Sequence, residues 1–422
     1  MTTDILFTYQ PSCIDEPTWT DLQRLHPSFR AFLQENRAAS EKYVADLPLR
    51  KRWFQTHGFK PSANLCMDGR VSDHGNAVDV PVGIFEMYRS AGSRNTLRNF
   101  MYASRTFESV TRSSAIHIDG RAYDLAEMRF MTAHWSMSHP TTASCKAWEN
   151  QTAKALAAMQ DQAHELNFCF TGRMVAFPTL IDTDLDAITM YGPGEPYSVF
   201  RLSKELGPDK APDPGSIVDA LRKTFPMDWH PLAALTPAHR EAFHPELAER
   251  VIANLAFVRN VIASERPLEL IEHGERMIFV GRHADWIDTH NSVFLIDDTE
   301  ERSSVLASFS IAIPIVARNV IADAVAAEDK EWIVPVVINV PYNEPDSDRL
   351  VAVQYARYLK ADLVQAIRKD QSSIFGLLDG THSIRPDRMP TWMLHQVTGI
   401  ADRIRIVMSV SRRKTRLFEP FT

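Results

Sequence analysis

The sequence predicts an α/β protein with a mainly parallel β-sheet and flanking helices, because apolar runs alternate along the chain with amphipathic helical patterns. Three stretches carry this prediction. Residues 126–136 form an apolar run typical of a buried strand, and residues 146–166 place apolar residues at helical spacing. Residues 173–192 then indicate a strand, a turn and a second strand.

We expect three domains along the chain. Residues 1–60 are polar with apolar residues at helical intervals, which indicates a helical N-terminal arm. Residues 61–250 contain the alternating strands and helices of a first α/β domain. Residues 251–422 hold a second α/β domain whose first strand begins near Arg276. A chain of 422 residues is long for a single core, which agrees with this division.

The second α/β domain resembles a degenerate copy of the first. Residues 127–140 align without a gap with residues 332–345, once an offset of one residue is allowed at the start of the segment 331–345. Residues 67–73 align with residues 279–285. These matches predict a fused pseudo-dimer in which one half has lost its polar site residues. The predicted pairs are Cys66 with Ile278, Asp68 with Val280, His134 with Asn339, and Cys145 with Leu350.

Composition and charge exclude several classes of protein. A net charge of −7 without a basic tract argues against nucleic-acid binding. No apolar run reaches the about 18–20 residues needed to span a bilayer, and the first thirty residues lack the order of a secretory signal. Four scattered cysteines at this length do not form a disulfide framework, so we expect a reducing cytoplasm.

Residues 64–71, NLCMDGRV, offer a thiol, a carboxylate and a guanidinium at alternating positions: Cys66, Asp68 and Arg70. Residues two apart on a strand end point to the same face, so these groups can converge on one cavity. Downstream, HWSMSHPTTASC supplies His134 and Cys145. Two cysteines and one histidine are ligands typical of a catalytic zinc, whose fourth tetrahedral position stays open for water.

Other residues of similar chemistry have competing interpretations. Cys13 and Cys169 are expected to be small buried apolar side chains. His139 lies closer to Cys145 in sequence and competes with His134 as a ligand, although His134 is favoured because it ends the apolar run. His74 follows the first motif and is either a proton shuttle or a solvated loop residue.

Three acidic residues, Asp182, Asp184 and Asp186, also invite two interpretations. They indicate either a cation site or a turn, and the absence of a complete calcium-binding loop favours the turn.

The pattern Cys66-x-Asp68-x-Arg70, with a later histidine and cysteine, resembles the signature of the β-class carbonic anhydrases. Residues 80–92, VPVGIFEMYRSAG, resemble the strand and small-residue turn that follow the first ligand in that class. The usual pattern has two residues between the histidine and the second cysteine, whereas ten separate His134 from Cys145. The carboxysomal shell carbonic anhydrases resemble this arrangement more closely, through HWSMSHPTTASCKA, the IDTDLDAI stretch at 181–188, and the order of arm, catalytic domain and degenerate copy.

This resemblance implies a zinc-dependent lyase that converts CO₂ reversibly to bicarbonate. Zinc held by Cys66, His134 and Cys145 would lower the pKa of bound water from about 15.7 toward neutrality. Asp68 would accept a hydrogen bond from the resulting hydroxide and orient it, and Arg70 would hold Asp68 ionised by a paired contact. Arg89 and Arg94 would either line a bicarbonate path or pair with surface acids.

The same resemblance implies a homo-oligomer, a dimer or higher, and contacts with a carboxysome shell or Rubisco. A carboxysome is therefore the alternative location to the cytoplasm. Two alternative functions remain: hydrolysis of another small linear molecule such as COS or CS₂, and a non-catalytic zinc-containing shell or scaffold component.

Overall fold

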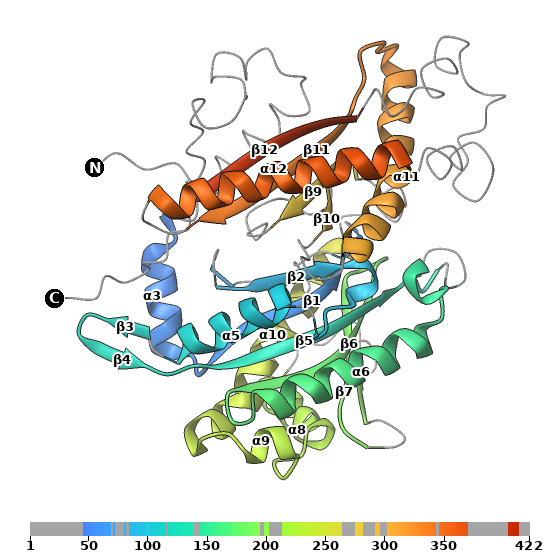
Figure 1. Ribbon diagram of the computed structural model, residues 1–422. Helices are drawn as coiled ribbons and strands as arrows, with labels where there is room; N and C mark the ends of the chain where they lie inside the picture. Colours follow the sequence, from blue (N-terminus) through green and yellow to red (C-terminus); the bar gives the residue numbers. More distant parts are fainter. Residues whose placement is uncertain are drawn as a thin grey trace. The chain divides into compact units, whose positions relative to one another are not determined.

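The computed structural model describes residues 45–68, 71, 80–81, 84–98, 100–114, 116–138, 140, 144–194, 198–201, 213–263, 275–281, 292–295, 302–342, 346–369 and 404–412. The described residues form two compact units, which separate between residues 263 and 275. We call them the first unit, described from residue 45 to 263, and the second unit, described from residue 275 to 412 (Figure 1).

The first unit is built on a six-stranded sheet in the order β2-β1-β5-β6-β7-β8. Strands β2, β1, β5 and β6 run parallel, and β7 and β8 extend the sheet antiparallel at one edge. This arrangement confirms the predicted α/β class with a mainly parallel sheet. The strands are β1 (Phe59–Cys66), β2 (Glu86–Ser90), β5 (Ala126–Trp135), β6 (Met174–Asp182), β7 (Ala187–Tyr191) and β8 (Val199–Arg201).

Helices connect and flank these strands (Figure 1). Helix α5 lies between β2 and β5 in the sequence, and α6 lies between β5 and β6, as parallel pairing requires. The helices are α3 (Leu47–Thr56), α5 (Phe100–Ser113), α6 (Thr152–Cys169), α8 (Pro214–Thr224), α9 (His230–Ala233) and α10 (Pro237–Ala263). Two 3₁₀ turns, η2 (Ala91–Ser93) and η3 (Lys146–Trp148), and a hairpin of β3 (Ile116–Ile118) and β4 (Arg121–Tyr123) complete the unit.

Helix α10 belongs to the first unit and is bonded to it along its length. Near its start, the Nε2 atom of His239 lies 2.8 Å from the carbonyl oxygen of Asp124. Further along, the side chain of Asn254 accepts from the backbone N–H of Ile188 and donates to the carbonyl of Asp186. The boundary expected between residues 250 and 251 falls inside this helix. Of the expected N-terminal arm, residues 1–44 lie outside the described part of the chain.

Aromatic side chains form the core on one face of this sheet. The rings of Phe177 on β6 and Phe225 are 4.9 Å apart between centroids, and Phe243 on α10 packs edge-on against both. Phe59 at the start of β1 also meets Phe243 edge-on, at 5.6 Å. Because edge-to-face aromatic pairs bury large areas, this cluster fixes α10 to the sheet.

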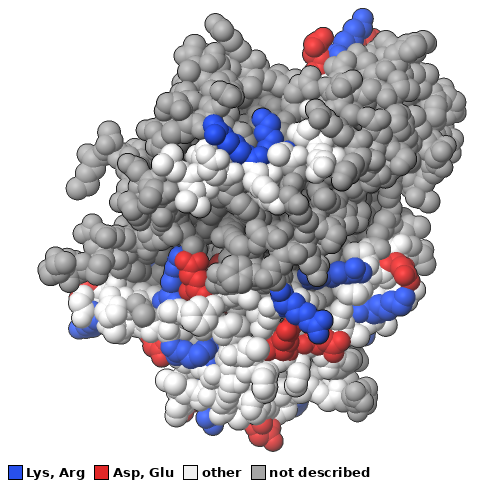
Figure 2. Space-filling model, in the orientation of Figure 1, with Lys and Arg blue, Asp and Glu red and all other residues white. Residues whose placement is uncertain are grey.

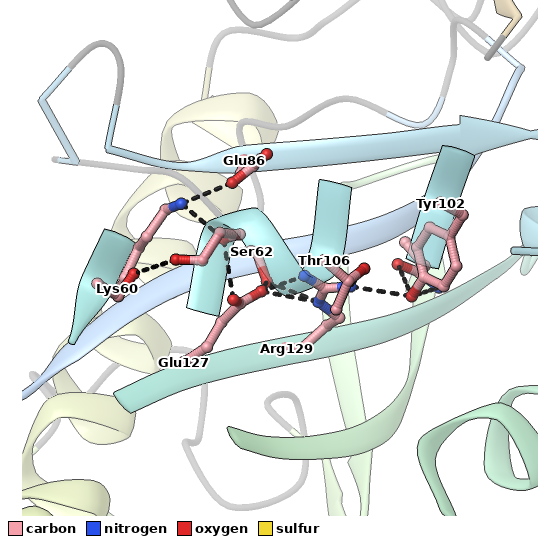
Figure 3. Close-up of polar contacts among 10 residues, drawn as sticks. Lys60, Ser62, Glu86, Tyr102, Thr106, Glu127 and Arg129 are labelled. Carbon is pink, nitrogen blue, oxygen red and sulfur yellow. Dashed lines mark hydrogen bonds and ion pairs between the residues drawn. The ribbon is translucent and has the colours of Figure 1, made fainter. Parts of the chain in front are cut away.

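The side of β1 and β5 that meets α5 is polar instead (Figure 3). We call this set the polar cluster. The guanidinium of Arg129 pairs with the carboxylate of Glu127 and donates to the hydroxyls of Tyr102 and Thr106, each at 2.9 Å. Its members are Lys60, Ser62 and Asn64 on β1, Glu86 on β2, Tyr102, Thr106 and Ser109 on α5, and Glu127 and Arg129 on β5.

The second unit contains a four-stranded parallel sheet in the order β10-β9-β11-β12. This order and direction are those of β2-β1-β5-β6 in the first unit, and in both units a helix precedes each of the last two strands. The elements are β9 (Met277–Gly281), β10 (Ser292–Leu295), α11 (Arg302–Ala327), β11 (Val334–Tyr342), α12 (Asp346–Lys369) and β12 (Ile404–Arg412).

The strand registers correct one part of the predicted alignment. Asn64 of β1 pairs with Met131 of β5, whereas Ile278 of β9 pairs with Val336 of β11. Since the alignment of residues 127–140 places Met131 on Val336, the sheet matches Ile278 with Asn64 rather than with Cys66. The alignment of residues 67–73 with 279–285 is therefore shifted by two residues from the pairing that the strand register gives. A shift of two residues keeps each side chain on its face of the sheet.

In the part of the chain that the structure describes, no helix combines the length and the apolar character needed to cross a membrane. On the face drawn in Figure 2, the coloured Lys and Arg side chains are interspersed with Asp and Glu.

Candidate metal centre

Three predicted ligands meet at the carboxyl ends of neighbouring strands. Cys66 is the last residue of β1, His134 is the penultimate residue of β5, and Cys145 lies just before η3. Because β1 and β5 are parallel neighbours, their carboxyl ends share one edge of the sheet, where α/β proteins place their sites. All three side chains are buried, and one potential ligand atom from each lies within 4.8 Å of the others.

The geometry of these three residues fits a tetrahedral metal ion. The two sulfur atoms are 4.0 Å apart. Two thiolates bound at about 2.3 Å to one tetrahedral zinc lie about 3.8 Å from each other. The Nδ1 atom of His134 is buried and has no hydrogen-bond partner among the described residues. This group of buried donors could therefore hold a metal ion, and its chemistry suits zinc.

The two thiols are strongly coupled to each other. A hydrogen bond from Cys145 lowers the pKa of the Cys66 thiol well below its usual value. The same contact, together with burial, raises the pKa of the Cys145 thiol. Because only thiolates are zinc ligands, metal binding would require that both cysteines lose their thiol protons.

Asp68 stands at the edge of the ligand group. Its Oδ2 atom lies 3.7 Å from Nε2 of His134, and its side chain is buried. This distance exceeds a hydrogen bond and places the carboxylate beside the ligands. Arg70 lies outside the described residues, so its predicted contact with Asp68 stays a prediction.

Arg89 is buried, so it is not the surface residue that one of the two expectations described, and its place beside a bicarbonate path stays a prediction. Its side chain is buried, and its guanidinium donates to main-chain carbonyls of the loop that follows β1. The acceptors are the oxygen atoms of Cys66 at 3.0 Å, Asp68 at 3.4 Å and Val71 at 2.7 Å. These contacts hold the backbone that carries Cys66 and Asp68. No sequence motif signals an arginine whose acceptors are carbonyl groups.

Arg94, in contrast, lies over an aromatic ring. Its guanidinium carbon is 4.2 Å from the ring centroid of Trp148, and it also donates to the carbonyl oxygen of Ala147. It therefore contacts η3, the turn that follows Cys145.

Gly92 joins the two cysteine-bearing segments. Its N–H donates to the sulfur of Cys66 at 3.3 Å, and its carbonyl accepts from Nε1 of Trp148 at 2.8 Å. Its φ of +65° is left-handed, and an added Cβ would lie 2.7 Å from Cβ of Ala147 and 2.8 Å from Nε1 of Trp148. Only glycine fits this position without displacing the turn that carries Cys145.

Gly92→Ala is expected to weaken zinc binding and to destabilise the protein by about 1–3 kcal/mol, through a left-handed alanine and its clash with η3. Competition with a chromophoric chelator measures the affinity. Gly120→Ala is a matched control, because Gly120 has a φ of +76° and an added Cβ would meet nothing within 4 Å. Equal zinc affinity in both variants would contradict the joining role of Gly92.

Asp182 is the last residue of β6, and Asp184 and Asp186 lie in the turn between β6 and β7. Asp182 and Asp184 accept hydrogen bonds from the segment that follows His134. Burial raises the pKa of Asp182 to about 6. The interpretation as a turn, rather than a cation site, agrees with carboxylates that face hydrogen-bond donors.

The structure describes one of the four remaining candidates, Cys169. Cys169 is exposed at the end of α6, so the expectation of a buried apolar side chain was wrong there. The helical end places it on the outer surface, away from the sheet. Cys13, His74 and His139 lie outside the described residues.

No family model matches this chain, and no curated protein is similar to it in sequence.

Proposed function

We propose that this protein is a zinc-dependent carbonic anhydrase of the β class, a lyase that interconverts CO₂ and bicarbonate. The observation that carries the proposal is the buried Cys66–His134–Cys145 group, with its sulfur atoms 4.0 Å apart and the Asp68 carboxylate beside it. The resemblance of both sequence motifs to that class adds to this observation.

Each residue has a distinct part in the proposed reaction. Cys66, His134 and Cys145 would hold the zinc, which when bound supplies an activated water at neutral pH. Asp68 would accept the proton of that nucleophile in a hydrogen bond and direct its lone pair toward the carbon of CO₂. Arg89 would keep Asp68 and Cys66 in position, because it holds their main-chain carbonyls.

We further propose that the second unit is a degenerate copy of the first. The equal strand order of β2-β1-β5-β6 and β10-β9-β11-β12 supports this proposal, as do the helices that precede the last two strands. The strand register matches Cys66 with Val280, an apolar residue that cannot bind zinc.

Two other functions suit the same ligand group. Hydrolysis of COS or CS₂ would use the same activated water, and the shape of the pocket would decide between these substrates. A structural zinc in a shell or scaffold component is less well supported. Structural zinc usually has four protein ligands, whereas three converge among the described residues.

Asp68→Asn is expected to retain zinc and to lower CO₂ hydration by about 100-fold or more, because the neutral amide is a weaker acceptor than the carboxylate and one of its two positions donates instead of accepting. Metal analysis and stopped-flow hydration of CO₂ measure the two properties on the same preparation. Asp161→Asn, at an exposed position of α6, is the matched control.

If the wild-type protein binds zinc but does not hydrate CO₂, the proposed carbonic anhydrase function is ruled out. The same stopped-flow comparison with COS would then test the hydrolase, and inactivity on both substrates would leave the structural role. Wild-type protein without zinc affinity would reject all three functions.

A further inference from the structure

Residues 135–138, which follow His134, form hydrogen bonds with residues 182–184 at the end of β6 and in the turn that leads to β7. Asp184 makes the largest number of these bonds among the described residues of the turn. Its Oδ1 accepts from the hydroxyl of Ser136 at 2.8 Å, and its Oδ2 accepts from Ser138, from the N–H at 2.7 Å and from the hydroxyl at 2.6 Å.

Neighbouring residues of the turn extend this attachment. Thr183 donates its N–H and its hydroxyl to the carbonyl of Trp135, at 2.8 and 3.0 Å. Oδ1 of Asp182 accepts from the N–H of Met137 at 3.2 Å and from that of Asp184 at 3.1 Å. Each residue from 135 to 138 is therefore held by a residue from 182 to 184.

One contact connects this attachment to the second cysteine. The N–H of Ser136 lies 3.4 Å from the hydroxyl oxygen of Ser144, and Ser144 directly precedes Cys145. Ser136 and Ser144 are both buried. Asp184 thus contacts the chain that follows His134, and the N–H of Ser136 makes the further hydrogen bond that connects this contact with the residue before Cys145.

A cation at this turn would need free acceptor atoms. The carboxylate oxygens of Asp184 instead face three donors, all from hydroxyl or backbone N–H groups. These contacts indicate that the Asp184 carboxylate holds Ser136 and Ser138 in place.

We propose that Asp184 is a positioning residue of the metal centre, which sets the placement of His134 relative to Cys145 by anchoring the loop between them. The inference rests on the proposed zinc site. Residues outside the first coordination shell determine how well the ligands fit a metal, and their loss lowers metal affinity by about 10–100-fold.

Asp184→Asn in the full-length protein tests the proposal. The amide keeps the shape of the side chain but removes its charge, which weakens the hydrogen bonds that Ser136 and Ser138 donate to it. We expect zinc affinity, measured by chelator competition, to fall by about 10–100-fold. We also expect the visible spectrum of the cobalt-saturated variant to differ from that of cobalt-saturated wild type, because the ligands sit differently around the ion.

Asp228→Asn, at an exposed turn before α9, should leave affinity and spectrum unchanged. Ser138→Ala removes one bond to Asp184 and should give a smaller loss of affinity, which keeps the proposal testable if Asp184→Asn does not fold. Wild-type affinity and an unchanged cobalt spectrum in both variants would overturn the positioning role alone. A wild-type protein that binds neither zinc nor cobalt would overturn the metal centre itself.

Discussion

Arg129→Met is expected to destabilise the first unit by about 3–5 kcal/mol, because it leaves the Glu127 carboxylate buried without its partner. Both side chains are fully buried. The guanidinium also donates to Ser62, Tyr102 and Thr106, so the substitution leaves three hydroxyls with fewer partners (Figure 3). Urea unfolding followed by circular dichroism measures the loss.

The double variant Glu127→Gln/Arg129→Met separates the cost of an unpaired charge from the cost of lost packing. Ser62 and Ser109 donate to different oxygens of Glu127, so the neutral amide can accept from one of these hydroxyls and donate to the other. We expect this variant to recover more than half of the stability that Arg129→Met loses. If the double variant were as unstable as the single one, the buried charge would not be the cause.

The polar cluster shows why sequence patterns predicted the sheet better than its packing. Residues 126–136 were expected to form a buried strand, and β5 covers Ala126–Trp135. Glu127 and Arg129 within it gave no sign that they pair with each other under α5. Their partners lie on β1 and α5, from Ser62 to Ser109, and such contacts depend on tertiary structure.

Helix boundaries were predicted less well where a turn interrupts the pattern. The helix expected over residues 146–166 is α6, Thr152–Cys169, preceded by the separate turn η3. Glu149 and Asn150 between them have positive φ angles of 55° and 58°. Left-handed residues of this kind end one helical segment before the next begins. Asparagine is compatible with that conformation, but glutamate rarely adopts it, so the pair is not predicted by sequence.

Spacing predicted that Cys66 and Asp68 lie near each other, because Cys66 ends β1 and Asp68 follows it by two residues. The approach of Cys145 could not be derived in this way, since ten residues separate it from His134. Its position depends on two contacts seen only in the structure: the fit of η3 against Gly92, and the attachment of residues 135–138 to the turn at Asp184.

Cys145→Ser is expected to have the largest effect on the metal. A serine hydroxyl is a poor zinc ligand at neutral pH, and the site would keep two of its three protein ligands. The loss of zinc affinity should exceed the loss of about 10–100-fold that follows when a residue supporting a metal ligand is removed. Hydration of CO₂ should fall to background at micromolar zinc, and added zinc should no longer raise the melting temperature, because ligand binding stabilises only a protein that binds it.

Cys169→Ser makes the same chemical change at an exposed position on α6 and should retain wild-type zinc content and activity. Metal analysis, thermal unfolding with and without added zinc, and stopped-flow hydration compare the two variants directly. One equivalent of tightly bound zinc in Cys145→Ser would show that Cys145 is not a ligand. Loss of zinc from Cys169→Ser as well would point to a general effect of removing a thiol, and the proximity of the sulfurs of Cys66 and Cys145 would then need another explanation.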